Sequence, residues 1–319
     1  MRYLRSAKVV AGLSILLLFV LVALFGPMIA PHSANWQAST SAYTPLSPSG
    51  RFWLGTDVEQ HDLFSQVLAG GRDTLLISLL AGVIATVLSV VIGVTAGYVG
   101  GLVDDLLSAL TNIFLALPGL LLLMVALKAL PSNDTGNPLI IGAVIAATAW
   151  AWGARVLRAQ TLSLRNQDYV EAARVIGERK PRIIMFEIVP NLLPILASSF
   201  IFTVIYGIGA YATLAWLGLI GGNAVTWGTM LFQAQNHGAL IAGFWWWYAP
   251  PALCVAAVGV ALALLNFGID EIVNPRLTSA RSSRGHRVRF VLGLTPVVRT
   301  PAPLAGTDLP LELPEEAAK

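Results

Sequence analysis

Residues 171–194 read EAARVIGERKPRIIMFEIVPNLLP, a polar and charge-dense stretch between two long hydrophobic segments. It contains the pattern EAA-x-x-x-G at 171–177 and the sequence P-N-L-L-P at 190–194. Proline is tolerated in the first turn of a helix, because its missing N–H would lack a partner there anyway. Pro190 and Pro194 therefore mark the return of the chain into a hydrophobic helix.

The polar part of this stretch predicts a short helix over 168–175. Asp168 and Glu171 lie in its first turn, where carboxylates are stabilised by the positive end of the helix dipole. Gly177 can end the helix in a left-handed conformation. Small or apolar residues supply a compact contact surface: Ala172, Ala173 and Val175.

Composition places this short helix in an integral membrane protein. The chain has 319 residues, of which 56% are hydrophobic and 12% charged, and its mean hydropathy is +0.72. Soluble domains carry roughly 25% charged residues. The sequence therefore predicts an all-α polytopic membrane protein with no large soluble domain. Its one cysteine, Cys254, cannot form an internal disulfide and lies in an apolar run.

Six stretches are long and apolar enough to cross a membrane, which takes about 20 residues. The fourth is the weakest, because Arg155 enters its last turn, where the side chain can reach the membrane surface. The last two lie in one run, 188–269, that contains no Asp, Glu, Lys or Arg. The predicted spans are 9–30, 74–98, 106–127 (which contains Pro118), 139–157, 192–219 and 246–267.

The distribution of Lys and Arg predicts the orientation. With both termini in the cytoplasm, 17 of the 20 Lys and Arg residues fall on the cytoplasmic side, and the 159–190 loop lies there too. The first span has a basic flank like that of a signal peptide, but its apolar run is longer than the usual 7–15 residues of a signal core. A retained helix is therefore favoured over a cleaved leader.

The stretch 171–194 resembles the coupling loop of bacterial ABC importer permeases. Other motifs agree, at these positions: GTD at 55–57, AGY-x-GG-x-x-D at 96–104, ALP at 116–118, LGL at 217–219, WG at 227–228 and NPRL at 274–277. The resemblance covers residues 9–277 and points to the second, C-type permease of the dipeptide, oligopeptide and nickel importer family. It implies a type I importer permease core at 73–277, preceded by an N-terminal helix and extracytoplasmic segment at 1–72.

This resemblance implies that the short helix contacts an ATPase, through Asp168, Glu171, Ala172, Ala173, Gly177, Glu178 and Arg179. The chain has no G-x-x-x-x-G-K-[ST] phosphate loop, so we expect no enzyme and no cofactor in it, with ATP and Mg bound by partners. The expected partners are two ATP-binding cassette subunits, a paralogous B-type permease, an extracytoplasmic binding protein and membrane lipid, without nucleic acid. The expected location is the bacterial cytoplasmic membrane, as a multi-pass protein that imports peptides, with oligosaccharides or nickel complexes as alternatives.

Several residues depart from the family pattern. GTD-x-x-GRD reads GTDVEQHD here, so Gln60 and His61 replace a glycine and an arginine. Pro181 occupies a position in the loop where a helix former is usual, and Asn274 replaces an aspartate. The tail 278–319 lies outside the resemblance; its composition is typical of disorder. Its basic first half could bind anionic lipid headgroups, although the cytoplasmic excess of positive charge explains it equally well.

Polar residues inside the spans suggest a route for the solute. Ser199, Thr203 and Tyr206 share one helix face, and Asn112 and Asn266 add amides on two other spans. Such groups face a wet path or the helix bundle, or else bond neighbouring helices. We expect no charged residue at mid-membrane depth, which would suit a neutral or varied solute. The histidines are scattered, so no metal site is expected, at His32, His61, His237 and His286.

Three further expectations remain. Trp245–Tyr248 form an aromatic cluster that either marks the membrane interface or stacks on substrate. Gly93 and Gly97 allow another helix to approach closely. Two functions of other classes are an ion-coupled secondary transporter, which usually needs inverted repeats and a buried acid, and an intramembrane hydrolase, which needs a motif such as H-E-x-x-H; neither signal is found in the sequence.

Overall fold

A computed structural model describes residues 7–38, 44–131, 136–220 and 224–273. These residues are mainly helical, and their β pairing is limited to two isolated bridges, Gln37↔His61 and Thr56↔Asp62. The predicted tail at 278–319, Asn274 and His286 lie outside the described residues.

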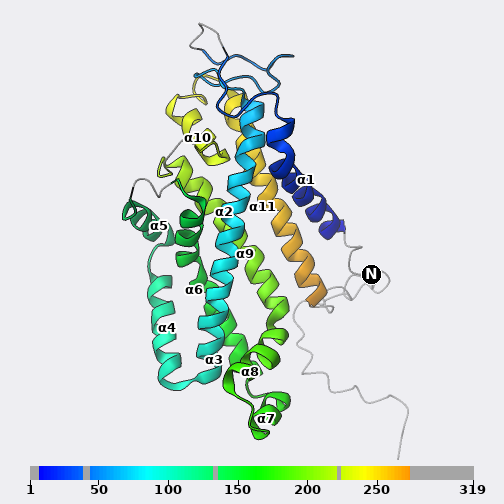
Figure 1. The fold of residues 1–319 in the computed structure, drawn as a ribbon, viewed down its shortest axis with the longest axis vertical. Coiled ribbons are helices and arrows are strands. Elements are labelled where there is room, and N and C mark those ends of the chain that lie inside the picture. Colours follow the sequence, from blue (N-terminus) through cyan, green and yellow to red (C-terminus); the bar gives the residue numbers. More distant parts are fainter. Residues whose placement is uncertain (1–6, 39–43, 132–135, 221–223, 274–319) are drawn as a thin grey trace, which may run out of the picture. The chain divides into compact units, whose positions relative to one another are not determined.

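Five of the predicted spans are long helices (Figure 1). The second continues without a break from α2 through a π-helical turn, η2, and α3. Their bounds are α1 (Ala7–Ile29), α2 (Leu63–Ser89) with η2 (Val90–Val94) and α3 (Thr95–Val99), α6 (Pro138–Leu164), α9 (Val189–Trp216) and α11 (Trp245–Val273).

The third predicted span is broken rather than continuous. It consists of α4 (Gly101–Ala116) and α5 (Gly119–Lys128), whose axes differ by 90°. Leu117 and Pro118 between them are extended, with ψ of 136° and 112°. Proline disfavours the helical conformation of the residue before it and removes a hydrogen-bond donor, so the ALP motif is where the span bends. Six spans are therefore five straight helices and one bent pair.

The predicted end of the fourth span is also wrong. It was placed at residue 157, but α6 runs on to Leu164, so Arg155 lies more than two turns before the end of the helix. The error arises because Thr161 and its neighbours read as polar loop, whereas α6 continues as a straight helix beyond the apolar stretch. Arg155 therefore cannot be treated as a residue of the last turn.

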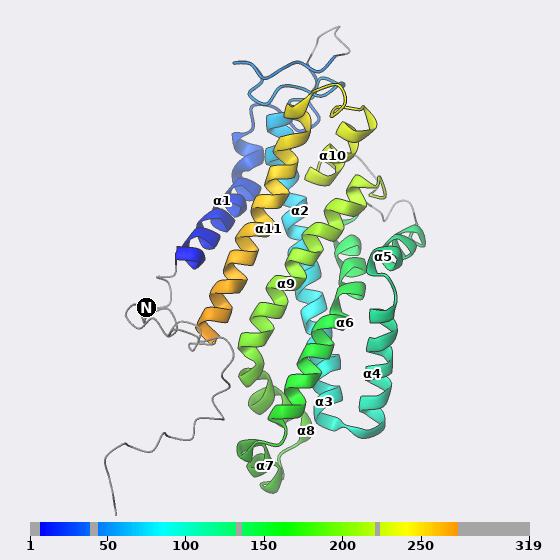
Figure 2. The same ribbon diagram turned by 180° about the vertical axis from the view of Figure 1, so that it is seen from behind.

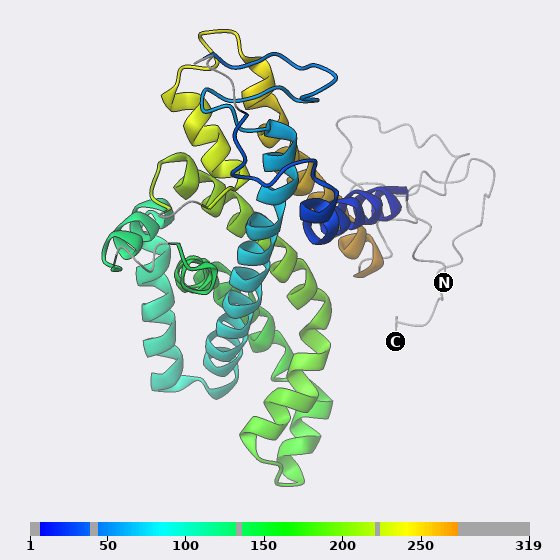
Figure 3. The ribbon, with the colours of Figure 1, turned by 45° about the horizontal axis from the view of Figure 1, so that its top comes forward.

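The helices pack around α2, which contacts α6, α9 and α1, while α1 also packs along α11. Figure 3 shows α2 between α1 and α6. Gly93 and Gly97 lie directly against the backbone of α6: a Cβ on Gly97 would meet the carbonyl of Arg158 at 2.8 Å, and one on Gly93 would overlap Ala154. The expected close approach of helices at these two glycines is confirmed.

The surface of the long helices is apolar. On α1 alone, Leu17, Leu18 and Leu24 are each about 60% exposed. Soluble proteins rarely expose large contiguous apolar surfaces, whereas lipid covers them at no cost. This surface agrees with the hydrophobic spans.

Short helices lie at the two ends of this arrangement (Figures 1 and 2). One end, here called the α7 end, comprises residues 165–188, with α7 (Asp168–Val175), α8 (Lys180–Ile183) and the π-helical turn η3 (Ile184–Ile188). The other, the α10 end, comprises the described residues of 31–62 and 224–248, with α10 (Trp227–Asn236). Each end holds one candidate site.

Candidate functional site

The helix α7 is anchored to the long helices by an apolar cluster. Val170 is fully buried, and Ala173 packs beside it. The cluster joins α7 to six other elements, η2, α3, α6, α8, η3 and α9, through one buried residue of each: Val94, Tyr98, Leu157, Ile183, Ile188 and Leu192. This close packing holds α7 against α3, α6 and α9.

The C-terminus of α7 is closed by a Schellman motif. Gly177 has φ of 89°; its N–H donates to the carbonyl of Arg174 at 3.0 Å, and the N–H of Glu178 donates to that of Ala173 at 3.1 Å. A side chain is strained at this φ. The predicted left-handed end of the helix at Gly177 is confirmed.

Arginines tie the α7 end to α3. The guanidinium of Arg174 lies 5.1 Å over the ring of Tyr98, and Arg165 donates to the carbonyl of Gly97 at 3.1 Å. Glu178 and Arg182 pair at 3.0 Å on the surface. Pro181 lies in the first turn of α8, where proline is accommodated, so this departure from the family pattern leaves the loop intact.

The outer side of α7 is exposed and carries large apolar residues near its C-terminus. Val175 is 88% exposed and Ile176 is 80% exposed; Glu171 and Ala172 beside them are also exposed, whereas Ala173 is half-buried. Asp168 and Arg179 are exposed at either end of the helix. Sequence reasoning missed Ile176, although a bulky apolar residue directly before the terminal glycine of a polar loop was a usable signal.

The residues predicted to line a path lie on three helices. Ser199 is buried and Tyr206 is 38% exposed on α9, while Thr203 donates to the carbonyl of Ser199 at 2.8 Å. Asn266 on α11 has a buried Oδ1 without a hydrogen-bond partner among the described residues. Asn112 on α4 accepts a hydrogen bond from Arg155 at 2.9 Å.

Two arginines lie on the side of α6 that faces α4. Arg158, one turn further, is neutralised by Asp104, with N–O distances of 2.5 and 2.7 Å. Arg155 is exposed, and its hydrogen bond goes to an amide. Both arginines line a cavity of about 90 Å³ between α4 and α6. Arg155 therefore lies inside the helix α6, more than two turns before its end, and the expectation that no charge lies at mid-membrane depth stays a prediction.

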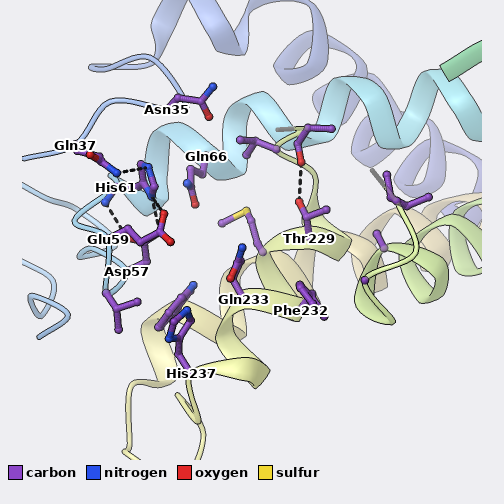
Figure 4. Close-up of a pocket in the computed structure, with 18 residues that line it drawn as sticks. Asn35, Gln37, Asp57, Glu59, His61, Gln66, Thr229, Phe232, Gln233 and His237 are labelled. Atoms are coloured by element: carbon purple, nitrogen blue, oxygen red, sulfur yellow. Dashed lines mark hydrogen bonds and ion pairs between the residues drawn. The ribbon is translucent and has the colours of Figure 1, made fainter. Parts of the chain in front are cut away.

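At the α10 end, a larger pocket of about 470 Å³ opens between the 35–66 segment and α10 (Figure 4). His61 and Asp57 pair across its wall at 2.8 Å. This hydrogen bond to Asp57 raises the pKa of His61 above its ordinary value of 6.5; burial opposes the shift, and the charges of Asp57 and Glu59 add to it.

The aromatic cluster at the start of α11 is divided between surface and core. Trp245 is 63% exposed, whereas Trp247 is fully buried and stacks on His237 with ring centroids 5.7 Å apart. Trp247 also lines the pocket. The cluster is therefore not one uniform belt.

Residues 89–279 match the family described as binding-protein-dependent transport system inner membrane component, and residues 1–48 match the N-terminal transmembrane domain of oligopeptide transport permease C. The chain belongs to the first of these families.

Relatives of these permeases cover most of the chain. The dipeptide transport system permease protein DppC of Bacillus subtilis is 30% identical over 86% of this chain and 83% of its own. The di/tripeptide transport system permease protein DppC of Pseudomonas aeruginosa is 32% identical over 84% of this chain and 88% of its own. A solved structure of the inward-facing MetNI methionine ABC transporter is 21% identical, with a TM-score of 0.48, over 67% of this chain and 95% of its own.

As a binding-protein-dependent permease, the chain is a multi-pass component of the inner membrane and a transport subunit rather than an enzyme. ABC importers of this family work with ATPase subunits and a binding protein. The predicted resemblance to a C-type permease is confirmed by the family matches and the relatives. Among the described residues, no three His, Cys, Asp or Glu side chains lie together as a metal site would require.

Proposed function

We propose that the chain is the C-type permease of an ABC importer for di- and oligopeptides, delivered by an extracytoplasmic binding protein. The proposal is supported by relatives named for dipeptide and di/tripeptide transport. Its partners are a paralogous B-type permease and two ATP-binding cassette subunits, which bind ATP and Mg. The single observation that carries the coupling role is an anchored short helix with an exposed apolar tip.

The coupling step uses α7 as a rigid contact. Its exposed side presents Ala172, Val175 and Ile176 to a groove on the ATPase, with Glu171 beside them. Its other side is fastened by Val170. Closure of the two ATPase subunits on ATP therefore moves α7, and the shared apolar cluster moves the helix ends with it. The other predicted coupling residues maintain the conformation of the helix and supply the charged groups at its two ends: Asp168, Ala173, Gly177, Glu178 and Arg179.

The solute path runs along the face of α9 that carries Ser199, Thr203 and Tyr206. Tyr206 supports this choice, because it stays 38% exposed and its hydroxyl lies beside Gly119, next to the bend between α4 and α5. Asn112 extends the path along α4, and Arg155, which donates a hydrogen bond to Asn112, lies beside it. Asn266 contributes an unpaired amide oxygen from α11.

The membrane orientation and the domain boundaries of the chain follow the same pattern. The α7 end lies in the cytoplasm and the α10 end outside, as the Lys and Arg distribution predicts. Residues 1–72 form the first helix and an extracytoplasmic segment, 73–277 form the permease core, and 278–319 form a cytoplasmic tail.

The substitution Ile176→Asp tests the coupling role. It places a charge on the apolar tip, and we expect the ATPase subunits to be lost from the affinity-purified permease and ATP-driven dialanine uptake by proteoliposomes to fall at least about tenfold, since charge at the centre of an interface is strongly disfavoured. The matched control is Ile241→Asp, at an isoleucine of the α10 end that is 95% exposed.

The control shows whether an added surface charge by itself releases the ATPase subunits. ATPase subunits should remain bound in Ile241→Asp. If Ile176→Asp retains its ATPase subunits and transports dialanine like the wild type, α7 is not the coupling element. If the wild-type complex, with its binding protein, imports no peptide at all, the proposed substrate class is wrong.

A further inference from the structure

The pocket at the α10 end has the size of a small-molecule site. Its volume of about 470 Å³ falls within the roughly 300–1,000 Å³ typical of such sites. Asn35, Asp57 and His61 form one wall, and Gln233 and His237 of α10 face them (Figure 4). The two walls come from segments far apart in the sequence.

The charged and polar groups of this pocket are suited to a cation. Asp57 and Glu59 supply carboxylates, and none of the described lining residues is lysine or arginine. Gln66 is 7% exposed and points into the pocket (Figure 4). Its amide nitrogen donates to the carbonyl of Ala34 at 3.4 Å, while its carboxamide oxygen accepts no hydrogen bond from the described residues. Because a carboxamide oxygen is a hydrogen-bond acceptor, a ligand in the pocket that brings a donor can bond to it.

The remaining lining is apolar and aromatic. Phe232 and Trp247 line the pocket, with Val225, Met230 and Ile220. Aromatic faces attract cations through the ring quadrupole, and aliphatic side chains accept the carbon atoms next to a charged head. A ligand with one ammonium group on a small, partly apolar body matches this lining.

The protonation state of His61 changes the net charge of the pocket. In the family pattern this position is arginine, a permanent cation beside Asp57, whereas His61 can release its proton. Every titratable group around His61 bears on this: Asp57 at 2.8 Å and Glu59 at 3.7 Å from its Nδ1, His237 across the pocket, and the neighbouring pair His32 and Asp62. Loss of the His61 proton therefore leaves the two carboxylates uncompensated.

We propose that this pocket binds a primary ammonium group, the free N-terminus of the peptide being transported. This inference rests on the proposed function, which places the pocket on the side from which the peptide arrives. The carboxylates of Asp57 and Glu59 and the oxygen of Gln66 accept its N–H groups. The ammonium and the His61 proton compete for the same carboxylates, so each weakens the binding of the other.

The experiment measures equilibrium binding of radiolabelled dialanine to the assembled importer in nanodiscs, without the binding protein. We expect N-acetyl-dialanine, which lacks the ammonium, to bind at least about tenfold more weakly, as charged hydrogen bonds are lost. Dialanine affinity should rise from pH 6 to pH 7.5, where the peptide N-terminus remains mostly protonated.

Three variants sharpen the result. Glu59 is 56% exposed, so Glu59→Gln should fold normally and bind dialanine about three- to tenfold more weakly. Asp105→Asn, the same acid-to-amide change at an exposed residue of α4, should leave affinity unchanged. His61→Arg should weaken binding and remove its pH dependence.

Equal binding of dialanine and its acetylated form would overturn the ammonium site, as would no binding of either probe. So would a Glu59→Gln affinity no different from that of Asp105→Asn. Uptake of dialanine by the same importer with its binding protein is measured in parallel. If uptake proceeds while the site fails these tests, only this inference falls; if no peptide is taken up, the proposed function falls.

Discussion

The α7 end and the α10 end are built in different ways. The α7 end is one continuous segment, and its short helix carries exposed apolar residues above a buried cluster. The α10 end joins segments far apart in the sequence, and Trp227 also ties it to α2, because its indole N–H donates to the carbonyl of Val67, 160 residues away, at 2.9 Å. A continuous segment keeps its shape by local hydrogen bonds, whereas the α10 end depends on long-range packing.

The largest expected effect is that of Trp227→Ala. This residue is 1% exposed and packs against Gly71 and Phe19. Its truncation should cost about 3–5 kcal/mol of stability and speed amide hydrogen exchange at the α10 end while α7 stays protected. Thermal unfolding and hydrogen exchange of the purified protein measure both. Trp245→Ala, at a 63% exposed neighbour, should cost little, and similar losses in both variants would contradict the comparison.

Gly177→Ala should have an intermediate effect, confined to the opposite end. A side chain at φ of 89° costs on the order of 1 kcal/mol, so the end of α7 should exchange its amides faster and dialanine uptake should fall, while α10 is unaffected. Asparagine tolerates this conformation better, so Gly177→Asn should restore most of the protection. Alanine and asparagine variants with equal exchange rates would refute the strain at Gly177.

The smallest expected effect is the pH dependence contributed by His61. The pKa of His61 is raised in the folded protein, mainly by its hydrogen bond to Asp57. Its contribution to stability is therefore complete below the ordinary value of 6.5 and is lost as pH rises through the raised pKa. The melting temperature of the wild type should exceed that of His61→Gln by an amount that shrinks between pH 6 and pH 9. A difference that grows with pH would have the wrong sign.

Much of the α7 end could be predicted from the sequence because its signals are local. The acidic first turn and the left-handed Gly177 each depend on a few neighbouring residues. Gly93 and Gly97 could be predicted to allow close packing, since only glycine leaves room for another backbone. Their partner, α6, could not be named, because nothing in the spacing says which helix approaches.

Little of the structure of the α10 end can be predicted from the sequence. Gln60 and His61 were noted only as departures from a pattern, and Trp247 only as a member of an aromatic cluster. In the structure, Gln60 adopts the left-handed conformation, with φ of 67°, at the position where the family pattern has glycine. The prediction that Arg155 lies in the last turn of its helix is wrong for a related reason, because a helix can continue beyond the end of its apolar run.

Repeated membrane crossing, membership of the family and the position of the short polar helix can all be predicted from the amino-acid sequence, because hydropathy, turn chemistry and motif spacing act over a few residues. The contacts between distant segments are visible only in the folded protein: Arg155 against Asn112, α6 against two glycines, and two carboxylates opposite α10 in one pocket. Those pairings depend on how helices distant in the chain fill space against each other, and close packing is a property of the whole bundle.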